Sequence, residues 1–351
     1  MQKLFAIWLL CFTYCVTASE MKTQVIFINP GYADTNPTGP FWQSVSTVMT
    51  SAALDLSINL DIRYANRDHI LMKQLVLQAL NEQPDYLIVV DEKSVITKIL
   101  LQSKANKTQL YFLLNRPSSI ELERLRSKGY QIAGSVVADN LKVGKALMEE
   151  MLRRSQIHNG TLFALLGDEV TPSSVDRERG LLSVANKQYN LKLREKLYAN
   201  WSEPEAYHLI LGLAQRYPDL VMIWSANDAM AAGAARALTK LGIRDKIVVG
   251  GINWDPQAQL LDVSFGGHML LGAKSLINIF NLVHELHEPN THQTLNIFDA
   301  RDEKYLELLK HIPTDGLKAV DFLKFTESAS SPLSFTLSNI VQELSLRTSN
   351  D

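Results

Sequence analysis

The residue types that usually carry enzyme chemistry form no recognisable catalytic pattern in this chain. There is no Gly-x-Ser-x-Gly nucleophile turn and no Gly-x-Gly-x-x-Gly dinucleotide fingerprint. His284 and His287 stand close together, but they lack the i, i+4 spacing of a helical zinc motif. Gly167-Asp168-Glu169 lacks the lysine of a phosphate-binding loop. We therefore expect no catalytic residue, no metal, no cofactor and no enzyme activity.

A second set of side chains follows runs of sequence that predict buried strands. Asparagine, arginine and tryptophan recur at these positions: Asn115, Arg116, Trp201, Asn227, Asn253 and Trp254. An amide both donates and accepts hydrogen bonds, and a guanidinium offers five donors. Because ligands of open parallel sheets bind beyond the carboxyl ends of the strands, these side chains are expected to line a site for a small molecule.

The elements that position them alternate between short apolar strands and amphipathic helices. The first half predicts strands at 24–29, 60–64, 86–90 and 109–114, with helices at 41–56, 70–81 and 94–103. The pattern then restarts, with helices at 141–154, 175–188, 204–216 and 229–241 and strands at 162–166, 191–199, 220–224 and 247–252. Near-continuous apolar strands separated by helices indicate parallel βαβ units. The expected fold class is α/β, with two doubly wound parallel-sheet lobes and a site between them.

The N-terminal residues predict export. Lys3 precedes an apolar run at 4–12, and small residues follow at 17–19, which is the layout of a cleaved secretory signal. The run is shorter than the ~20 residues that a membrane span needs. Both cysteines, Cys11 and Cys15, lie inside this segment, so the mature chain would hold no disulfide. We expect residues 1–19 to be removed and the protein to be soluble in a periplasm.

The length and net charge of the chain limit the classes of molecule that the protein is expected to bind. A chain of 351 residues is long for one core and fits two lobes. Its formal net charge of -2 provides no field to attract nucleic acid or anionic lipid. The expected partner is therefore a small molecule.

Six segments carry a resemblance to a known family when they are taken in order. They are 41–42 (FW), 114–116 (LNR), 137–141 (VADNL), 177–180 (RERG), 226–234 (ANDAMAAGA) and 248–253 (VVGGIN). Their order resembles the type 1 periplasmic binding proteins, the group typified by the ribose-binding protein. Residues 29–31 (NPG) and 84–88 (PDYLI) are also similar to the autoinducer-2-binding receptors of this fold.

The resemblance implies a ligand site between the lobes. Phe41, Trp42 and Trp201 would stack on a sugar ring, and the forked guanidinium of Arg179 would bind two neighbouring oxygens. Polar contacts would come from Asn115, Asn227 and Asn253, with Arg116 and Trp254 as further candidates, whereas Arg177 is expected behind the site or on the surface. Asn115 and Asn253 stand where the ribose group has aspartates, so a sugar-like ligand other than ribose is expected.

The resemblance also implies how the chain is divided. Three crossings would join a first lobe (20–137 plus about 267–296) to a second lobe (138–266 plus about 297–325), with residues 326–351 as a C-terminal extension. Such a protein closes on its ligand and presents the closed form to a membrane partner. That partner is either an ABC permease, for transport, or a sensor kinase, for signalling. We expect the protein to act as a monomer.

Overall fold

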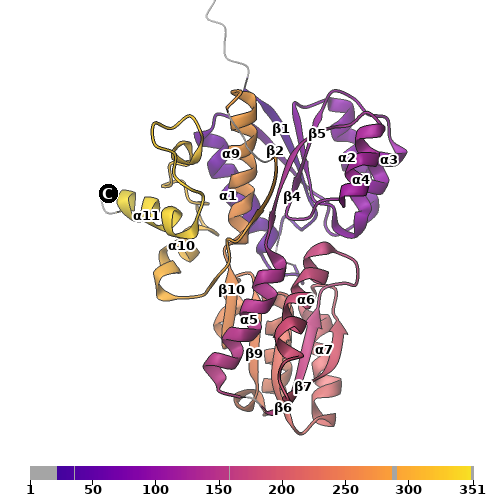
Figure 1. Ribbon diagram of the computed structural model, residues 1–351, viewed down its shortest axis with the longest axis vertical. Coiled ribbons are helices and arrows are strands. Elements are labelled where there is room, and N and C mark those ends of the chain that lie inside the picture. The colour runs from indigo at the N-terminus through magenta and orange to yellow at the C-terminus, as the bar shows by residue number, and fades with distance from the viewer. Residues whose placement is uncertain (1–21, 35, 158, 287–290, 349–351) are drawn as a thin grey trace, which may run out of the picture.

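The computed structural model describes residues 22–34, 36–157, 159–286 and 291–348. They form two α/β lobes, one above the other in Figure 1, each built on a six-stranded sheet. The predicted signal segment with both cysteines lies outside the described residues. Within the described ranges, no helix has the length and apolarity that crossing a membrane requires.

The first lobe has the strand order β11-β5-β4-β3-β1-β2, and all neighbouring strands are parallel. Its strands are β1 (Gln24–Asn29), β2 (Asn59–Tyr64), β3 (Tyr86–Val89), β4 (Gln109–Leu113), β5 (Gln131–Ala138) and β11 (His292–Leu295). Its helices are α1 (Phe41–Asp55), α2 (His69–Glu82), α3 (Val95–Gln102), α4 (Ser119–Ser127) and α9 (Leu271–Val283). Strands β1, β3 and β4 are almost wholly buried, which explains their continuous apolar sequences.

The second lobe has the strand order β12-β10-β9-β8-β6-β7. Its strands are β6 (Asn159–Leu166), β7 (Asn190–Tyr198), β8 (Leu220–Ser225), β9 (Val248–Ile252), β10 (Val263–Gly266) and β12 (Asp299–Ala300), the last antiparallel to β10. Its helices are α5 (Asn140–Ser155), α6 (Pro172–Ala185), α7 (Glu203–Leu213) and α8 (Asp228–Lys240). Helices α5 and α6 pack closely because Gly144 faces the carbonyl of Arg177, where a Cβ would lie only 2.1 Å from the oxygen.

The chain crosses between the lobes four times within the described residues: three crossings complete the two sheets, and a fourth, after β12, returns the chain to the first lobe. The chain passes from β5 to α5, from β10 to α9, and from β11 to β12, so strands from three separate parts of the sequence complete the two sheets. Two parallel-sheet lobes joined in this way confirm the predicted fold class. These crossings place the carboxyl ends of the strands of both sheets at the boundary between the lobes.

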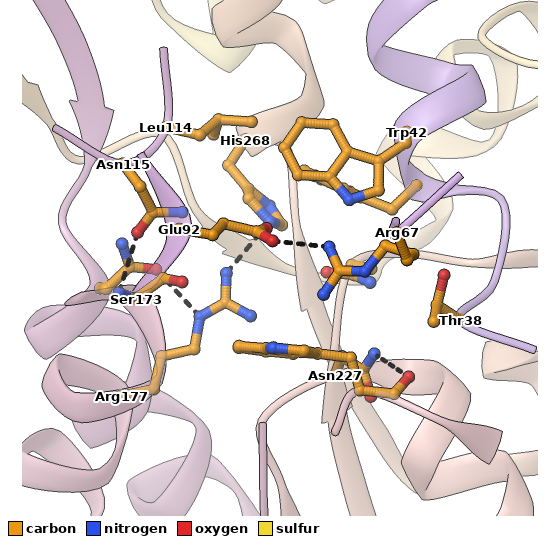
Figure 2. Close-up of a pocket in the computed structure, with 14 residues that line it drawn as sticks. Thr38, Trp42, Arg67, Glu92, Leu114, Asn115, Ser173, Arg177, Asn227 and His268 are labelled. Carbon is orange, nitrogen blue, oxygen red and sulfur yellow. Dashed lines mark hydrogen bonds and ion pairs between the residues drawn. The ribbon is translucent and has the colours of Figure 1, made fainter. Parts of the chain in front are cut away.

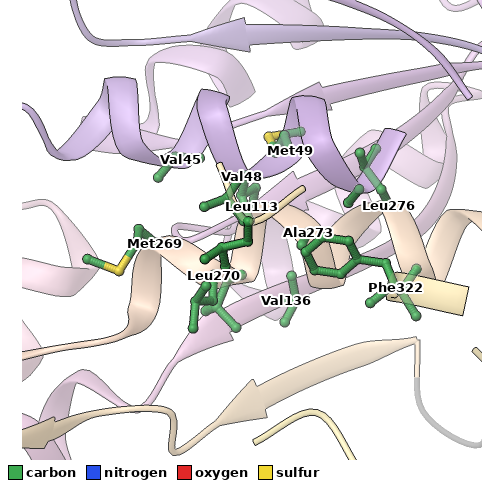
Figure 3. Close-up of a cluster of buried hydrophobic side chains, with 14 of the residues drawn as sticks. Val45, Val48, Met49, Leu113, Val136, Met269, Leu270, Ala273, Leu276 and Phe322 are labelled. Atoms are coloured by element: carbon green, nitrogen blue, oxygen red, sulfur yellow. The ribbon is translucent and has the colours of Figure 1, made fainter. Parts of the chain in front are cut away.

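The C-terminal residues pack on the first lobe. They contain α10 (Leu306–His311), a short 3₁₀ turn at Phe322–Phe325 and α11 (Leu337–Thr348). Apolar side chains of this segment share one buried cluster with α1 and α9, and Figure 3 shows Phe322 among them. Residues 297–325 were expected with the second lobe, but after β12 the segment returns to the first. The helical patterns in 303–325 indicated apolar faces without indicating which lobe would cover them.

Candidate functional site

A cavity of about 60 Å³ lies between the lobes at the carboxyl ends of both sheets. The residues lining it follow strands of either lobe: Thr38, Phe41, Trp42, Arg67, Glu92, Leu114, Asn115, Asn140, Ser173, Arg177, Trp201, Asn227, Asn253 and His268. Figure 2 shows Trp42 on one side of this space and Arg177 with Asn227 on the other. The site therefore needs both lobes.

The first lobe supplies an aromatic wall. The rings of Phe41 and Trp42 meet edge to face with 5.2 Å between centroids, and Phe41 stacks on His268 at 4.5 Å. Asn29 positions the start of α1, because its Nδ2 donates to the carbonyl of Trp42. Gly31 lies against the Trp42 ring, where a Cβ would come within 2.6 Å of Cγ. The glycine is thus needed for the Trp42 position.

The second lobe supplies a matching aromatic residue, Trp201. Its Nε1 donates to Oδ2 of Asp168 at 3.1 Å, and its ring covers Gly167 so closely that a Cβ there would lie 2.1 Å from Cε2. Trp201 adopts a φ of 64° in the turn after β7, in the left-handed region that residues other than glycine seldom occupy. Trp201 and Trp42 can therefore contact a ligand from opposite lobes.

Arg177 is the central cation of the site and is 4% exposed. Its Nε donates to Oδ1 of Asn140 at 2.9 Å, its Nη1 to the carbonyl of Ala226 at 2.6 Å, and its Nη2 to Nε2 of His268 at 3.1 Å. Burial lowers the pKa of Arg177 to about 9, a cost that the charge of Asp228 partly offsets. The guanidinium is thus held rigidly at the floor of the cavity and remains charged at neutral pH.

Hydrogen bonds across the cleft hold the lobes together. Oδ1 of Asn115, in the first lobe, accepts from the backbone N–H of Ser173 in α6 at 3.1 Å. The N–H of Glu203 donates to the carbonyl of Pro37 at 2.8 Å, which joins the loop before α1 to the second lobe. The described conformation is therefore a closed one.

An ion pair also borders the cavity. Nη1 of Arg67 lies 2.7 Å from Oε2 of Glu92, and the two side chains are 19% and 15% exposed. Arg67 follows β2 and Glu92 follows β3, so both come from the first lobe. The pair leaves no net charge in this part of the wall.

Two buried carboxylates lie behind the cavity wall. Oδ2 of Asp228 accepts from the N–H of Asp255 at 3.0 Å and from Oγ of Ser264 at 2.8 Å. Burial raises the pKa of Asp228 to about 7, and burial together with the charge of Asp228 raises that of Asp255 well above its usual range. Gly39 of the first lobe covers Asp255, and a Cβ there would lie 2.6 Å from Oδ2. When the lobes are closed, Gly39 therefore covers Asp255, and this buried environment favours the protonated form of the Asp255 carboxyl group.

This pair predicts a dependence of stability on pH. An acid whose pKa is raised on folding stabilises the fold most below its unfolded pKa, near 4, and this contribution is lost as pH rises through its folded pKa, which is about 7 for Asp228 and well above the usual range for Asp255. We expect Asp255→Asn to raise the melting temperature by about 2–4 °C at pH 8 and by much less at pH 5. Thermal unfolding at both pH values measures this. The exposed Asp245→Asn is the matched control, and an equal shift at both pH values for Asp255→Asn contradicts the prediction.

Six of the nine predicted site residues line the cavity, and three do not. Phe41, Trp42, Asn115, Trp201, Asn227 and Asn253 lie in its wall. Arg116 instead donates to Oγ of Ser135 in β5 and to the carbonyl of Gln293 in the neighbouring strand β11. Trp254 is buried against Tyr305, with 4.7 Å between the ring centroids.

Arg179 is the correction of most consequence. Its side chain is 65% exposed and pairs with Asp176 one turn away, whereas Arg177 points into the cavity. Two residues on a helix point about 200° apart, so only one arginine of the pair can face the site. Gly180 marks the buried face, because it contacts the backbone of α5 and lies three residues after Arg177. This spacing was the signal in the sequence that favoured Arg177.

Eight lining residues were not predicted: Thr38, Arg67, Glu92, Leu114, Asn140, Ser173, Arg177 and His268. Several of them also follow the carboxyl end of a strand, which is the position used to predict the other site residues. These are Arg67, Glu92, Asn140 and His268. In the described part of the chain, no group of three or more His, Cys, Asp or Glu side chains is arranged to hold a metal.

Comparisons with known proteins agree with this architecture. Residues 33–261 match the family model described as a periplasmic binding protein domain. The crystal structure of a periplasmic sugar-binding protein from Pseudomonas fluorescens is 30% identical, with a TM-score of 0.81 over 91% of this chain and 99% of that one.

Curated relatives point to the same family. The D-allose-binding periplasmic protein of Escherichia coli (strain K12) is 25% identical over 221 residues, which is 63% of this chain and 71% of that protein. The ribose import binding protein of the same strain is 27% identical over 186 residues, which is 50% of this chain and 60% of that protein. With the two-lobed fold and a site at the ends of both sheets, these matches establish that the chain belongs to the type 1 periplasmic binding protein family, in its ribose-binding-protein-like group.

Proposed function

We propose that this protein is a periplasmic solute-binding protein that closes its lobes over a small sugar-like ligand and delivers it to an ABC transporter. The observation that carries the proposal is the composition of the interlobe cavity. Trp42 and Trp201 provide apolar faces from opposite lobes, and asparagine amides with Arg177 provide polar contacts around them. A polyol has apolar C–H faces and a rim of hydroxyl groups, and this combination matches both.

Closure is the step that couples binding to delivery. The bond from the Ser173 N–H to Asn115 and the contact between Glu203 and Pro37 exist only when the lobes meet. A ligand that contacts residues of both lobes stabilises this form over an open one, because it makes both sets of contacts only there. A transporter that recognises the combined surface of the two lobes would then receive the loaded protein.

A receptor that reports to a membrane sensor kinase is the second candidate. The observation that favours it is the C-terminal segment, which lies outside the matched family domain and adds α10 and α11 to the first lobe. This segment gives a partner protein an additional surface beside α1 and α9. Growth of a strain lacking the gene on the ligand as sole carbon source separates the two, since only a transport protein is needed for uptake.

The first experiment is a thermal-shift screen of the exported protein against pentoses, hexoses, polyols, their acids and autoinducer-2. A ligand at 100 times its dissociation constant stabilises the folded state by about 2.7 kcal/mol, which such a screen detects readily. A clear shift with a sugar or sugar-like compound supports the proposal. If none of these compounds shifts the transition, the assignment of a sugar-like ligand is wrong.

A further inference from the structure

Arg177 is a buried cation without a carboxylate partner in the described part of the chain. Its bonds go to an amide oxygen, a backbone carbonyl and an imidazole nitrogen, and no carboxylate oxygen of the described residues forms an ion pair with it. Asp228 acts on it only through space, because its Oδ2 is bound to Asp255 and Ser264. An unpaired buried charge is costly, so such a group is normally matched by a charge of opposite sign.

Three asparagines of the cavity have their oxygens already bound by protein donors. Oδ1 of Asn115 accepts from Ser173, that of Asn140 from Arg177, and that of Asn227 from the N–H of Met230 at 2.9 Å. Backbone N–H groups and a guanidinium can only donate, so these contacts fix which end of each amide is the oxygen. Nδ2 of Asn140 donates to the carbonyl of Ala138 and that of Asn227 to the carbonyl of Trp201, so each keeps one N–H for a ligand, whereas Nδ2 of Asn115 keeps both.

His268 adds another donor. Its Nε2 accepts from Arg177, so the proton of the neutral ring resides on Nδ1, and Nδ1 is buried without a hydrogen-bond partner. The ring is held between Phe41 and Phe298, with centroid distances of 4.5 and 4.6 Å. Burial and the neighbouring Arg177 lower the pKa of His268, which keeps it in this neutral, donating form.

The acceptors of the cavity do not offset this excess of donors. The charge of Glu92 is neutralised by Arg67 at 2.7 Å. The amide of Asn253 is neutral and supplies no negative charge. The side chains of the wall therefore include one cation, Arg177, that no carboxylate of the wall pairs with.

Building on the proposed function, we propose that the ligand is a sugar acid whose carboxylate is bound beside Arg177 and His268. A single carboxylate supplies one negative charge and accepts from the unused N–H groups of the guanidinium, from Nδ1 of His268 and from the amide of Asn115. The remaining hydroxyl groups would lie between Trp42 and Trp201. A neutral sugar would leave the charge of Arg177 unmatched.

The test compares each neutral sugar with its own acid by isothermal titration calorimetry: D-galactose with D-galacturonate, and D-glucose with D-glucuronate and D-gluconate. Because the carboxylate of the acid would form a charged hydrogen bond with Arg177, we expect the best acid to bind at least about 10-fold more tightly than its neutral parent. If a neutral sugar binds as tightly as its acid or more tightly, the inference is overturned while the proposed function stands. If neither class binds, the inference is overturned, whereas the proposed function fails only if none of the compounds of the thermal-shift screen binds.

A substitution of nearly equal shape tests the charge directly. Asn115→Asp keeps an oxygen for the Ser173 N–H, but replaces a donor with a negative charge at the cavity. We expect it to weaken binding of the acid by about 10-fold or more and to reduce the preference for acid over neutral sugar. The exposed Asn186→Asp, at the end of α6, is the matched control and should leave both affinities unchanged. An unchanged preference in Asn115→Asp overturns the inference.

Discussion

Arg177→Met should weaken ligand binding by about 100-fold or more, whereas Arg179→Met should leave it unchanged. Arg177 is buried at the cavity floor and is fixed by bonds to Asn140, Ala226 and His268. Removing a buried charged donor costs about 2–5 kcal/mol, and each 1.4 kcal/mol is a factor of ten in affinity. Arg179 is 65% exposed and pairs only with Asp176.

The two variants form a matched pair on one helix. Because Arg177→Met leaves buried polar partners without a donor, its melting temperature must be measured beside its affinity. Arg177→Lys keeps a charge without the planar fork, and we expect it to fold and to bind more weakly than the native protein. Full affinity in a folded Arg177→Met, or loss of affinity in Arg179→Met, would show that the site has been assigned to the wrong arginine.

Gly167→Ala should weaken binding by about 10-fold or more without removing any side chain from the site. An added Cβ would lie 2.1 Å from Cε2 of Trp201, so the indole must move away from its place in the wall. Its bond from Nε1 to Asp168 would break or stretch. Loss of an aromatic contact and its hydrogen bond is worth about 1–3 kcal/mol, or about 5- to 150-fold in affinity.

Gly212→Ala is the control for this substitution. It lies in α7 of the same lobe, and no atom comes within 4 Å of the added Cβ. Calorimetry gives the affinity, and Trp201→Ala gives the effect of losing the whole ring. If Gly167→Ala binds as tightly as the native protein while Trp201→Ala does not, the indole can occupy its site from another rotamer, and the role given to Gly167 is wrong.

Much of the framework could be predicted from the sequence because parallel sheets leave a strong local pattern. Strands β1, β3 and β4 are buried on both faces, so they appear as continuous apolar runs between amphipathic helices. Once parallel strands are assigned, their carboxyl ends must share an edge, and this rule alone led to Asn115, Asn227 and Asn253.

The choice between neighbouring residues required the structure. Arg177 and Arg179 share one motif, but the contact of Gly144 and Gly180 between α5 and α6 decides which of them turns inward. Trp254 and Asn253 follow the same strand, yet the φ of 150° at Asn253 and the packing of Trp254 on Tyr305 send their side chains to different places. These outcomes depend on contacts between segments that are distant in sequence.

The sequence by itself therefore determined the two α/β lobes, the positions of β1 to β4 and of β6 to β9 along the chain, and the rim on which the site is built, because each depends on local periodicity. The tertiary structure alone decided that the C-terminal segment covers the first lobe, that Asn115 bonds across the cleft to Ser173, and that Arg177 lies buried without a carboxylate. Those features depend on which surfaces meet when two lobes close, and no local pattern in a chain specifies that.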